Sequence, residues 1–370
     1  MFNLIRLILQ GKNILLISPE PWEHIFVSKH HYAVHLGRRE NKVFFLGPPG
    51  KSNLLLGTTH RNVLSVQYTG FPKGLRFYPR LIQKYFIRRK FCELERLCNV
   101  QFDLVWSFDN SVFFDFSALS KTVVKISHIV DLTQNFQHAR AAATADMCLG
   151  TTHVIVERLR RHNSKSFFVQ HGYAEVKGDG EVDLTGNYGV KVGYAGNLNL
   201  KYIDWNTLNR LVTEYPKVGF YFAGPFRSDQ EMIDRIRQKS NVFLLGEISS
   251  ARLPDFYRQM DVLLLCYLAD KYTDQLSNPH KLMEYLGSGK MVVSTLTEEH
   301  RGLHDSGLLL MSDKNEQVDE LFRSALQNLN SWNSAEMQRL RRSVALANSY
   351  DRQIDRIELL LKEEVVDFPS

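Results

Sequence analysis

The sequence predicts an α/β protein built from two Rossmann-like, doubly wound domains. Short apolar segments of strand length alternate with amphipathic segments along both halves of the chain, and this alternation is typical of parallel βαβ units. Residues 174–190 hold four glycines and few apolar side chains, so they suit a linker between the halves. The length of 370 residues also exceeds one ordinary core and suits two domains.

Each half supplies its own set of strands and helices. In the first half, strands are expected at 13–18, 42–46, 62–68, 103–107, 122–126, 146–149 and 166–170, and helices at 22–39, 81–98 and 139–146. In the second half, strands are expected at 191–195, 219–223, 241–245, 261–266, 291–295 and 308–311, and helices at 204–215, 253–260, 279–288 and from 317 onward. Such domains bind ligands at the carboxyl ends of their strands, so we expect the active site in a cleft between the two.

Charge is divided unevenly between the halves. Residues 1–180 contain 24 Lys/Arg and 13 Asp/Glu, whereas residues 181–370 contain 22 and 27. The basic half therefore suits an anionic partner. The sequence lacks an apolar stretch of membrane-spanning length, and its first apolar run is interrupted by Arg6 and lacks a cleavage site of small residues, so we expect a cytoplasmic protein. The four cysteines form no C-x-x-C pair, which fits a reducing compartment.

One basic segment is interleaved with aromatic residues. Residues 71–96 hold eight Lys/Arg and two Glu together with six Phe or Tyr, a composition that suits the anionic surface of a membrane. A packed helix with a solvated charged face is the alternative. We expect no nucleic-acid partner, because no nucleic-acid-binding motif accompanies the charge.

The segment 277–295 (SNPHKLMEYLGSGKMVVST) carries the strongest chemical signal. Pro279 suits the first turn of a helix, and Lys281 and Glu284 would lie on one face near that helix start. Free N–H groups and a lysine would attract phosphate, and a carboxylate one turn further can accept hydrogen bonds from ribose hydroxyls. The same spacing also fits an ordinary amphipathic helix with a solvated Lys–Glu pair.

These residues resemble the donor-binding signature of GT-B glycosyltransferases of the retaining family-four (group 1) type, P-x-K-x-x-E-Y-L-x-x-G-K-x-V-V. GYAGNLN, GFYFAGP and NVFLLGEISSARLPDFYRQMDVLLLCY resemble the preceding parts of that domain in the same order. In the first half, DMCLGTTHVIVERLRRHNSKSFFVQHGYAE resembles the end of the family's first domain. Within the family, the chain most resembles bacterial enzymes that assemble surface polysaccharides, including teichuronic-acid-type transferases. The resemblance implies domains at 1–180 and 181–345, with 346–370 as a helix that crosses back to the first domain.

The resemblance also assigns roles to residues. Glu284 would contact the donor ribose, and Ser277, Asn278, Pro279, His280 and Lys281 would hold the diphosphate or sugar, next to the Gly196-Asn197 turn. Two positions depart from the family pattern. Leu276 stands where many relatives have a second acidic residue, and Asn197 replaces an arginine. Lys201 and Lys281 are therefore the cations expected to stabilise the leaving diphosphate.

In the first domain, His128 is expected just after a strand, at the cleft, where relatives place a histidine or aspartate near the reacting sugar, with Asp131 as the alternative. A loop histidine without a role is equally compatible with the pattern. Trp22 and His24, after the first strand, could contact an acceptor sugar, although a core tryptophan fits as well.

We therefore expect transfer of a sugar from a nucleotide-diphosphate donor to a glycan or lipid-linked acceptor, with retention and without a metal or other cofactor. His30, His31 and His35 share a predicted helix, but no carboxylate or cysteine joins them at metal-ligand spacing. Two alternatives remain at this point. A sugar-nucleotide epimerase shares the fold and would turn over donor without acceptor, and a non-catalytic sugar-nucleotide binder would release no product.

Overall fold

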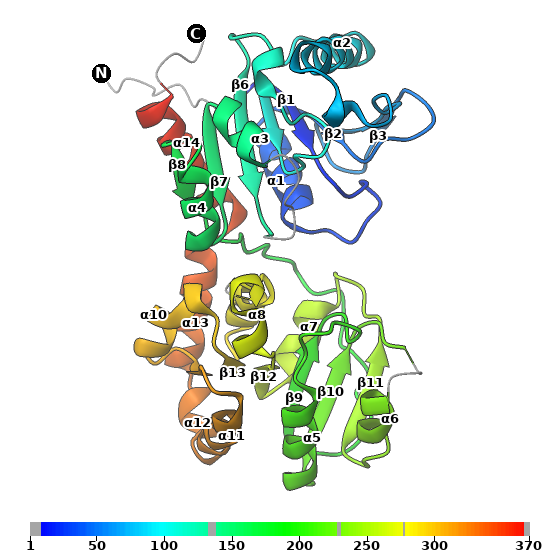
Figure 1. Cartoon of the computed structure of the whole chain (residues 1–370). Helices are drawn as coiled ribbons and strands as arrows, with labels where there is room; N and C mark the ends of the chain where they lie inside the picture. The colour runs from blue at the N-terminus through cyan, green and yellow to red at the C-terminus, as the bar shows by residue number, and fades with distance from the viewer. Residues whose placement is uncertain (1–8, 132–137, 228–230, 277, 366–370) are drawn as a thin grey trace, which may run out of the picture. The chain divides into compact units, whose positions relative to one another are not determined.

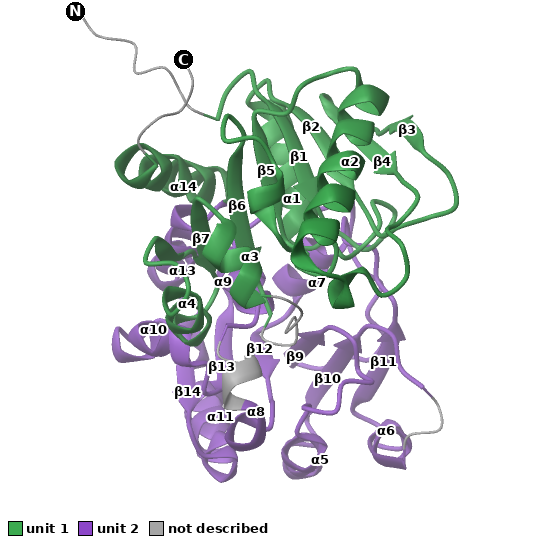
Figure 2. Cartoon of the chain, turned by 45° about the horizontal axis from the view of Figure 1, so that its top comes forward, with its two compact units in different colours: residues 1–170, 350–370 green, residues 171–349 purple. Residues whose placement is uncertain are grey.

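The computed structural model describes residues 9–131, 138–227, 231–276 and 278–365. The chain divides into two compact units (Figure 2). Unit 1 comprises residues 1–170 and 350–370, and unit 2 comprises residues 171–349. Both are mixed α/β units with a mainly parallel sheet, as the sequence predicts.

Unit 1 is built on an eight-stranded sheet of order β3-β4-β2-β1-β5-β6-β7-β8 (Figure 1). Its described elements are β1 (Asn13–Ile17), α1 (Ser28–Arg38), β2 (Lys42–Leu46), β3 (Leu54–Gly57), β4 (Val63–Gln67), the 3-10 helix η1 (Leu75–Phe77), α2 (Arg80–Cys98), β5 (Leu104–Ser107), η2 (Phe116–Ala118), β6 (Val124–Ile129), α3 (His138–Thr144), β7 (Met147–Gly150), α4 (His153–Arg160), β8 (Ser166–Phe168) and α14 (Tyr350–Glu364). The paired strands of this sheet are parallel except that β3 runs antiparallel to β4.

The apolar runs of unit 1 fill a core on the face of the sheet that α2 covers. Leu15 and Phe44 from the sheet pack with Ile87, Phe91 and Leu94 of α2. On helix α1, Arg39 donates hydrogen bonds at 2.7 Å to the backbone oxygen of Asp351 and at 2.8 Å to the carboxylate of Asp355. The helix α14 is thus held on α1, although more than 300 residues separate them in the sequence.

Unit 2 contains a six-stranded parallel sheet of order β11-β10-β9-β12-β13-β14. Its described elements are β9 (Val190–Ala195), α5 (Trp205–Glu214), β10 (Val218–Ala223), α6 (Glu231–Arg237), β11 (Val242–Gly246), α7 (Leu253–Gln259), β12 (Val262–Leu265), α8 (Ala269–Leu276), α9 (Lys281–Ser288), β13 (Met291–Thr295), η3 (Glu298–His300), α10 (Arg301–Asp305), β14 (Leu310–Ser312), η4 (Asn315–Gln317), α11 (Val318–Gln327), α12 (Leu329–Trp332) and α13 (Ala335–Ala347). Strand β12 is buried along its whole length, as expected for a central parallel strand covered on both faces.

Every strand expected from the sequence is present, but other details differ. The edge strand β3 and the short helices α6, α8 and α10 were not predicted, helix α1 begins at Ser28 rather than at Trp22, and β6 extends to Ile129. Strand β6 therefore contains His128 instead of ending before it. Among the described helices, none is both long enough and apolar enough to span a bilayer.

Candidate active site

The strand order of unit 2 marks one edge of its sheet as a ligand-binding edge. From β9 the chain proceeds outward through β10 and β11, and from β12 it proceeds in the opposite direction through β13 and β14. The order thus reverses between β9 and β12. In doubly wound sheets, ligands bind beyond the carboxyl ends of the strands at such a reversal. The turn after β9, which begins at Gly196, lies at this position.

Helix α9 brings Lys281 to the same turn. A β-carbon at Gly196 would overlap Cε of Lys281 and would lie 2.9 Å from both Lys281 Nζ and the hydroxyl of Tyr194. The lysine side chain therefore lies directly against the Gly196 backbone. A glycine is required there because any side chain would displace the ammonium group. The helix and the turn together place a cation at the carboxyl end of β9.

Glu284 follows one turn later on α9 and is held by a tyrosine of α7. The Tyr257 hydroxyl donates a hydrogen bond of 2.7 Å to Oε2 of Glu284. Tyr257 is buried, whereas Glu284 and Lys281 are half-buried. The second carboxylate oxygen of Glu284 forms no other protein hydrogen bond within the described part of the chain. This arrangement orients the carboxylate and leaves acceptor capacity for ligand hydroxyls.

Burial and mutual charge shift the pKa values of both groups. Desolvation raises the pKa of Glu284, while the hydrogen bond from Tyr257 and the Lys281 charge lower it. Desolvation lowers the pKa of Lys281, while the Glu284 carboxylate raises it. Each group thus carries a desolvation cost that an oppositely charged or hydrogen-bonding ligand can offset.

The framework of α9 is fixed at both ends. Near its start, the Tyr285 hydroxyl accepts a 3.0 Å hydrogen bond from the backbone N–H of Ala195 in β9. At its end, Gly289 takes a left-handed conformation (φ 82°), and the buried guanidinium of Arg341 donates to the Gly289 backbone oxygen at 3.0 Å. Arg342 donates to the backbone oxygen of Ser288, also at 3.0 Å. These contacts give Lys281 and Glu284 a rigid support.

The remaining donor-side candidates have different surroundings. Asn278 is buried, and the ring of His280 lies 6.2 Å from that of His171 in an edge-to-face arrangement. Asn197 is exposed and accepts a hydrogen bond of 2.9 Å from the backbone N–H of Asn199. The ammonium group of Lys201 lies 5.2 Å from the ring centre of Tyr272.

The other donor-side positions lie just before α9, at the end of α8 or outside the described residues. Pro279 lies two residues before the first residue of α9, and its backbone oxygen accepts a 3.1 Å hydrogen bond from the backbone N–H of Leu282. Leu276 is the last residue of α8. Ser277 lies outside the described residues.

Sequence reasoning missed two polar residues of unit 2, Tyr257 and His300. Tyr257 supports Glu284 from another helix. His300 is buried at the carboxyl end of β13, where its Nδ1 lies 3.2 Å from the hydroxyl of Thr297. Burial and the nearby His171 lower the pKa of His300 to about 3. The sequence offered no signal for Tyr257 or His300, because neither belongs to the segment that carries the motif.

Unit 1 has its own order reversal, between β1 and β5. The loop after β1 carries Trp22 and His24, so both sequence candidates lie near this reversal. Trp22 is half-buried and packs edge-to-face against Phe45, with ring centres 5.0 Å apart. His24 is exposed, and its Nδ1 lies 2.8 Å from the backbone oxygen of Ile25. Trp22 is thus partly a packing residue, and His24 is the more accessible of the two.

The same loop forms an ion pair with helix α1 that the sequence did not reveal. The ammonium of Lys29 lies 2.6 Å from the Glu20 carboxylate, and Lys29 is only 3% exposed. Both charges influence the pKa of Asp131. Although part of its side chain is solvent-exposed, desolvation raises the pKa of Asp131, with Lys29 lowering it and Glu20 raising it. Glu20, Lys29 and Asp131 thus form a charged group beyond the carboxyl ends of β1 and β6.

The expected placement of His128 was wrong. Its side chain is 1% exposed and lies within β6, not on a rim after the strand. The ring stacks on Phe108 with centres 4.6 Å apart, and its Nδ1 accepts a hydrogen bond of 3.3 Å from the indole N–H of Trp106. The strand continues through His128 because the flat ring fits between these aromatic residues. A catalytic role for His128 stays a prediction.

A cavity of 690 Å³ in unit 1 does not lie at a ligand-binding edge of a sheet. Its lining includes Lys42 at the start of β2 and Val63 at the start of β4. These are the amino ends of the parallel strands, opposite to the ends at which such sheets bind ligands.

Comparisons with known proteins agree with this geometry. Residues 189–330 match the family model described as glycosyl transferases group 1. No curated protein shows significant sequence similarity to the chain. Among solved structures, a sucrose-phosphate synthase from Thermosynechococcus elongatus superposes with a TM-score of 0.70 at 10% identity, covering 95% of this chain and 98% of that one.

Two further structures are similar along nearly the whole chain. The catalytic domain of starch synthase IV from Arabidopsis thaliana, bound to ADP and acarbose, has a TM-score of 0.65 at 11% identity and covers 97% of this chain and 100% of that one. WaaG, a glycosyltransferase involved in lipopolysaccharide biosynthesis, has a TM-score of 0.60 at 10% identity, with 93% and 98% covered. The fold is therefore that of the GT-B glycosyltransferases.

Proposed function

We propose that the chain, whose residues 189–330 match the family model of the group 1 glycosyl transferases, is a glycosyltransferase that moves a sugar from a nucleoside-diphosphate donor to a glycan or lipid-linked acceptor in cell-surface polysaccharide synthesis. The observation that carries the donor assignment is the pairing of Lys281 and Glu284 on α9, at the order reversal of unit 2. The acceptor class rests on the resemblance of the chain to surface-polysaccharide enzymes. WaaG, a structural neighbour, acts in lipopolysaccharide biosynthesis.

In this proposal Glu284 accepts hydrogen bonds from the ribose hydroxyls. Its carboxylate is oriented by the 2.7 Å hydrogen bond from Tyr257, so it needs little reorganisation when the donor binds. Asn278, Pro279 and His280 at the start of α9 would lie beside the diphosphate, where helix N–H groups attract phosphate oxygens. The Gly196-Asn197 turn makes room for the Lys281 side chain beside that group, because residue 196 has no side chain.

Lys281 would neutralise the diphosphate as the bond to the sugar breaks. In glycosyl transfer the sugar passes through an oxocarbenium-like state, and the departing diphosphate gains negative charge. A cation held in place before the reaction stabilises that charge without reorganisation. Lys201 is the second candidate cation. We expect retention of configuration and no metal ion in the stabilisation of the leaving group.

Unit 1 would supply the acceptor side. Asp131, at the carboxyl end of β6, and His24, in the loop after β1, have accessible side chains. Trp22 offers an aromatic surface for a sugar ring. His128 would act from inside the strand by supporting this edge, since its ring is buried.

The test is titration calorimetry with UDP and with ADP on the parent and on Glu284→Gln. A lost hydrogen bond to a charged group costs about 1.5–3 kcal/mol, so the affinity for the preferred nucleotide should fall about ten- to a hundredfold. Glu320→Gln on α11, an exposed carboxylate of the same unit, is the matched control and should bind as the parent does. If Glu284→Gln binds as tightly as the parent, α9 is only structural and the donor placement is wrong.

A further inference from the structure

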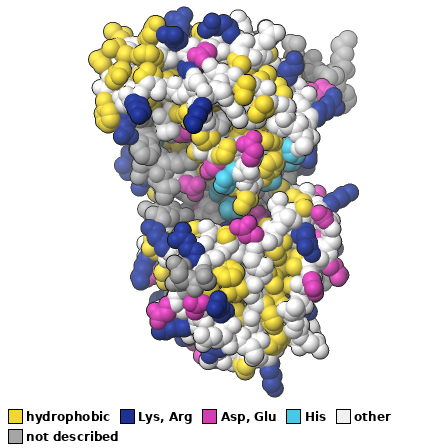
Figure 3. All heavy atoms as spheres, turned by 90° about the vertical axis from the view of Figure 1, so that its right-hand side faces the viewer, with side chains coloured by type: hydrophobic (Ala, Val, Ile, Leu, Met, Phe, Trp, Pro, Cys, Tyr) yellow, Lys and Arg dark blue, Asp and Glu magenta, His cyan; other side chains and the backbone are white. Residues whose placement is uncertain are grey.

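The outer face of η1 and the first turns of α2 is unusually apolar for a surface. Phe77 is 76% exposed, Leu81 82% and Tyr85 59%, and Tyr78 and Ile82 are exposed as well. Figure 3 shows hydrophobic side chains gathered with Lys and Arg on the end of the molecule that carries α2. We call the exposed side chains between residues 73 and 89 the η1–α2 surface. A contiguous patch of this kind marks an interaction site more often than chance exposure.

The fold does not need these side chains for its core. Helix α2 already buries a complete inner stripe, formed by Gln83, Ile87, Phe91 and Leu94 at helical spacing. Leu81 and Tyr85 lie on the opposite side of the helix and carry a second apolar stripe. Exposing that stripe to water is unfavourable unless a partner covers it.

The surface is also strongly basic. The cations of this stretch with exposed or half-buried side chains are Lys73, Arg76, Arg80, Lys84, Arg88 and Arg89. No Asp or Glu occurs anywhere from residue 71 to residue 92. The guanidinium of Arg76 lies over the Phe77 ring, 4.7 Å from its centre, so charge and aromatic surface are interleaved. The complementary partner is therefore anionic and also has an apolar layer.

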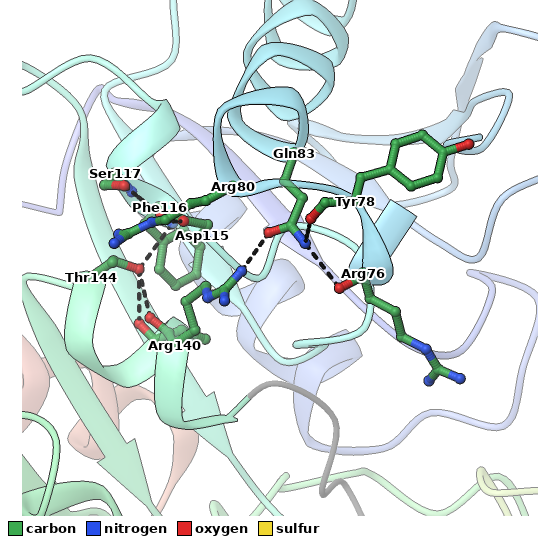
Figure 4. A network of polar contacts seen from close by, with 10 residues as sticks. Arg76, Tyr78, Arg80, Gln83, Asp115, Phe116, Ser117, Arg140 and Thr144 are labelled. Carbon is green, nitrogen blue, oxygen red and sulfur yellow. Dashed lines mark hydrogen bonds and ion pairs between the residues drawn. The ribbon is translucent and has the colours of Figure 1, made fainter. Parts of the chain in front are cut away.

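A polar network on the inner side of the η1–α2 surface fixes its backbone (Figure 4). The buried side-chain amide of Gln83 donates hydrogen bonds at 2.9 Å and 2.8 Å to the backbone oxygens of Arg76 and Tyr78, and its oxygen accepts one from Arg140 of α3. Figure 4 shows the side chains of Arg76 and Tyr78 pointing away from this network.

A second anchor fixes the start of α2. The Nε of Arg80 lies 3.1 Å from the carboxylate of Asp115, which is fully buried. The η1–α2 surface is thus pre-organised, and little conformational entropy is lost when a partner binds.

We propose that the η1–α2 surface docks the protein on a lipid bilayer that contains anionic lipids. Phe77, Leu81 and Tyr85 would enter the interfacial layer, and the flanking cations would bind the headgroups. A nucleic acid would bind the same cations, but it has no apolar layer that could cover Leu81 and Ile82. The docking itself is independent of the sugar chemistry. Its purpose, to bring the enzyme to a lipid-linked acceptor, rests on the proposed function.

Co-sedimentation of the full chain with vesicles tests this proposal. Binding to phosphatidylcholine vesicles that contain phosphatidylglycerol is expected, binding to pure phosphatidylcholine is not, and added salt should weaken it. Removing one cation should weaken binding about fivefold, and Arg88→Glu with Arg89→Glu about 25-fold or more. Leu81→Ser should weaken it about three- to tenfold through lost apolar contact.

Matched controls lie on the same unit, away from this surface. Arg161→Glu, at the end of α4, and Leu359→Ser, on α14 with 54% exposure, change an exposed cation and an exposed leucine. Both should bind as the parent does. Equal binding to neutral vesicles, binding to neither kind, or equal losses in the controls would overturn the proposal. Retention of a single-stranded oligonucleotide in place of vesicles would assign the surface to nucleic acid and overturn it too.

UDP and ADP calorimetry on the same variants separates this proposal from the proposed function. The surface variants should bind nucleotide as the parent does, because α2 belongs to unit 1 and α9 to unit 2. Nucleotide binding without vesicle binding rejects the docking surface alone. Vesicle binding without nucleotide binding rejects the proposed donor site alone.

Discussion

Replacing Tyr257 with phenylalanine tests whether the hydrogen bond from Tyr257 orients the Glu284 carboxylate for donor binding. The substitution removes the hydroxyl that donates 2.7 Å to Oε2 of Glu284 and keeps the ring, which packs against Tyr285 with centres 5.2 Å apart. A hydrogen bond to a charged group contributes about 1.5–3 kcal/mol. Part of that free energy orients the carboxylate, so we expect the affinity for UDP or ADP to fall about three- to thirtyfold.

The dependence of binding on pH provides a second readout. The hydrogen bond from Tyr257 lowers the pKa of Glu284, which burial raises. Without the hydroxyl the pKa of Glu284 rises further. If the ligand needs the carboxylate form, nucleotide binding weakens as pH falls through this pKa, and in Tyr257→Phe the weakening must begin at a higher pH than in the parent. Calorimetry across a pH series measures the shift.

The matched control is Tyr285→Phe, which removes a neighbouring buried hydroxyl that accepts its hydrogen bond from the Ala195 backbone. It should lower stability without moving the pH at which nucleotide binding weakens. The reasoning fails if Tyr257→Phe binds nucleotide with the parent's affinity and pH profile. It also fails if Tyr285→Phe shifts the profile equally, since the effect would then reflect packing rather than the contact with Glu284.

Two further predictions concern the same unit. In Gly196→Ala the new methyl group would overlap Lys281, so nucleotide affinity measured by calorimetry should fall, whereas Gly302→Ala, with open space around it, should leave affinity unchanged. Burial lowers the pKa of His300 to about 3 against an unfolded value of 6.5, so stability falls as pH drops below 6.5. Between pH 8 and pH 5, the loss of unfolding free energy measured with urea should be about 2 kcal/mol smaller in His300→Asn than in the parent, and an undiminished loss in that variant would contradict the assignment.

The strands were predictable because most of them are buried on both faces. Runs such as 262–265 and 291–293 are continuously apolar and are bounded by polar or glycine-containing segments, which fixes their type and position. Strand β3 escaped prediction for the opposite reason. Leu54, Leu55 and Leu56 are exposed at a sheet edge, so no alternation of buried and exposed residues marks them.

Side-chain roles were less predictable than strands. Glu284 and Lys281 could be proposed because helical spacing within one segment places them together. The contact between Tyr257 and Glu284 joins two helices across 27 residues, and the Lys29 charge on α1 acts on the pKa of Asp131 about a hundred residues later, so local patterns give no sign of either. His128 was misplaced because a titratable side chain was taken to end a strand, whereas its ring has aromatic neighbours that keep it buried.

One of the two departures from the family pattern, Asn197, has a structural explanation. Asn197, which replaces an arginine, accepts a hydrogen bond from the backbone of Asn199 and so shapes the turn after β9 rather than supplying charge there. The cation at that turn comes instead from Lys281 on α9. Within the described chain no carboxylate lies within ion-pair distance of its ammonium, and burial lowers its pKa. Burial removes water from the Lys281 ammonium, and a diphosphate would replace this lost hydration with an ion pair. The half-buried Lys281 therefore gains more from an anionic ligand than an exposed arginine at residue 197 would.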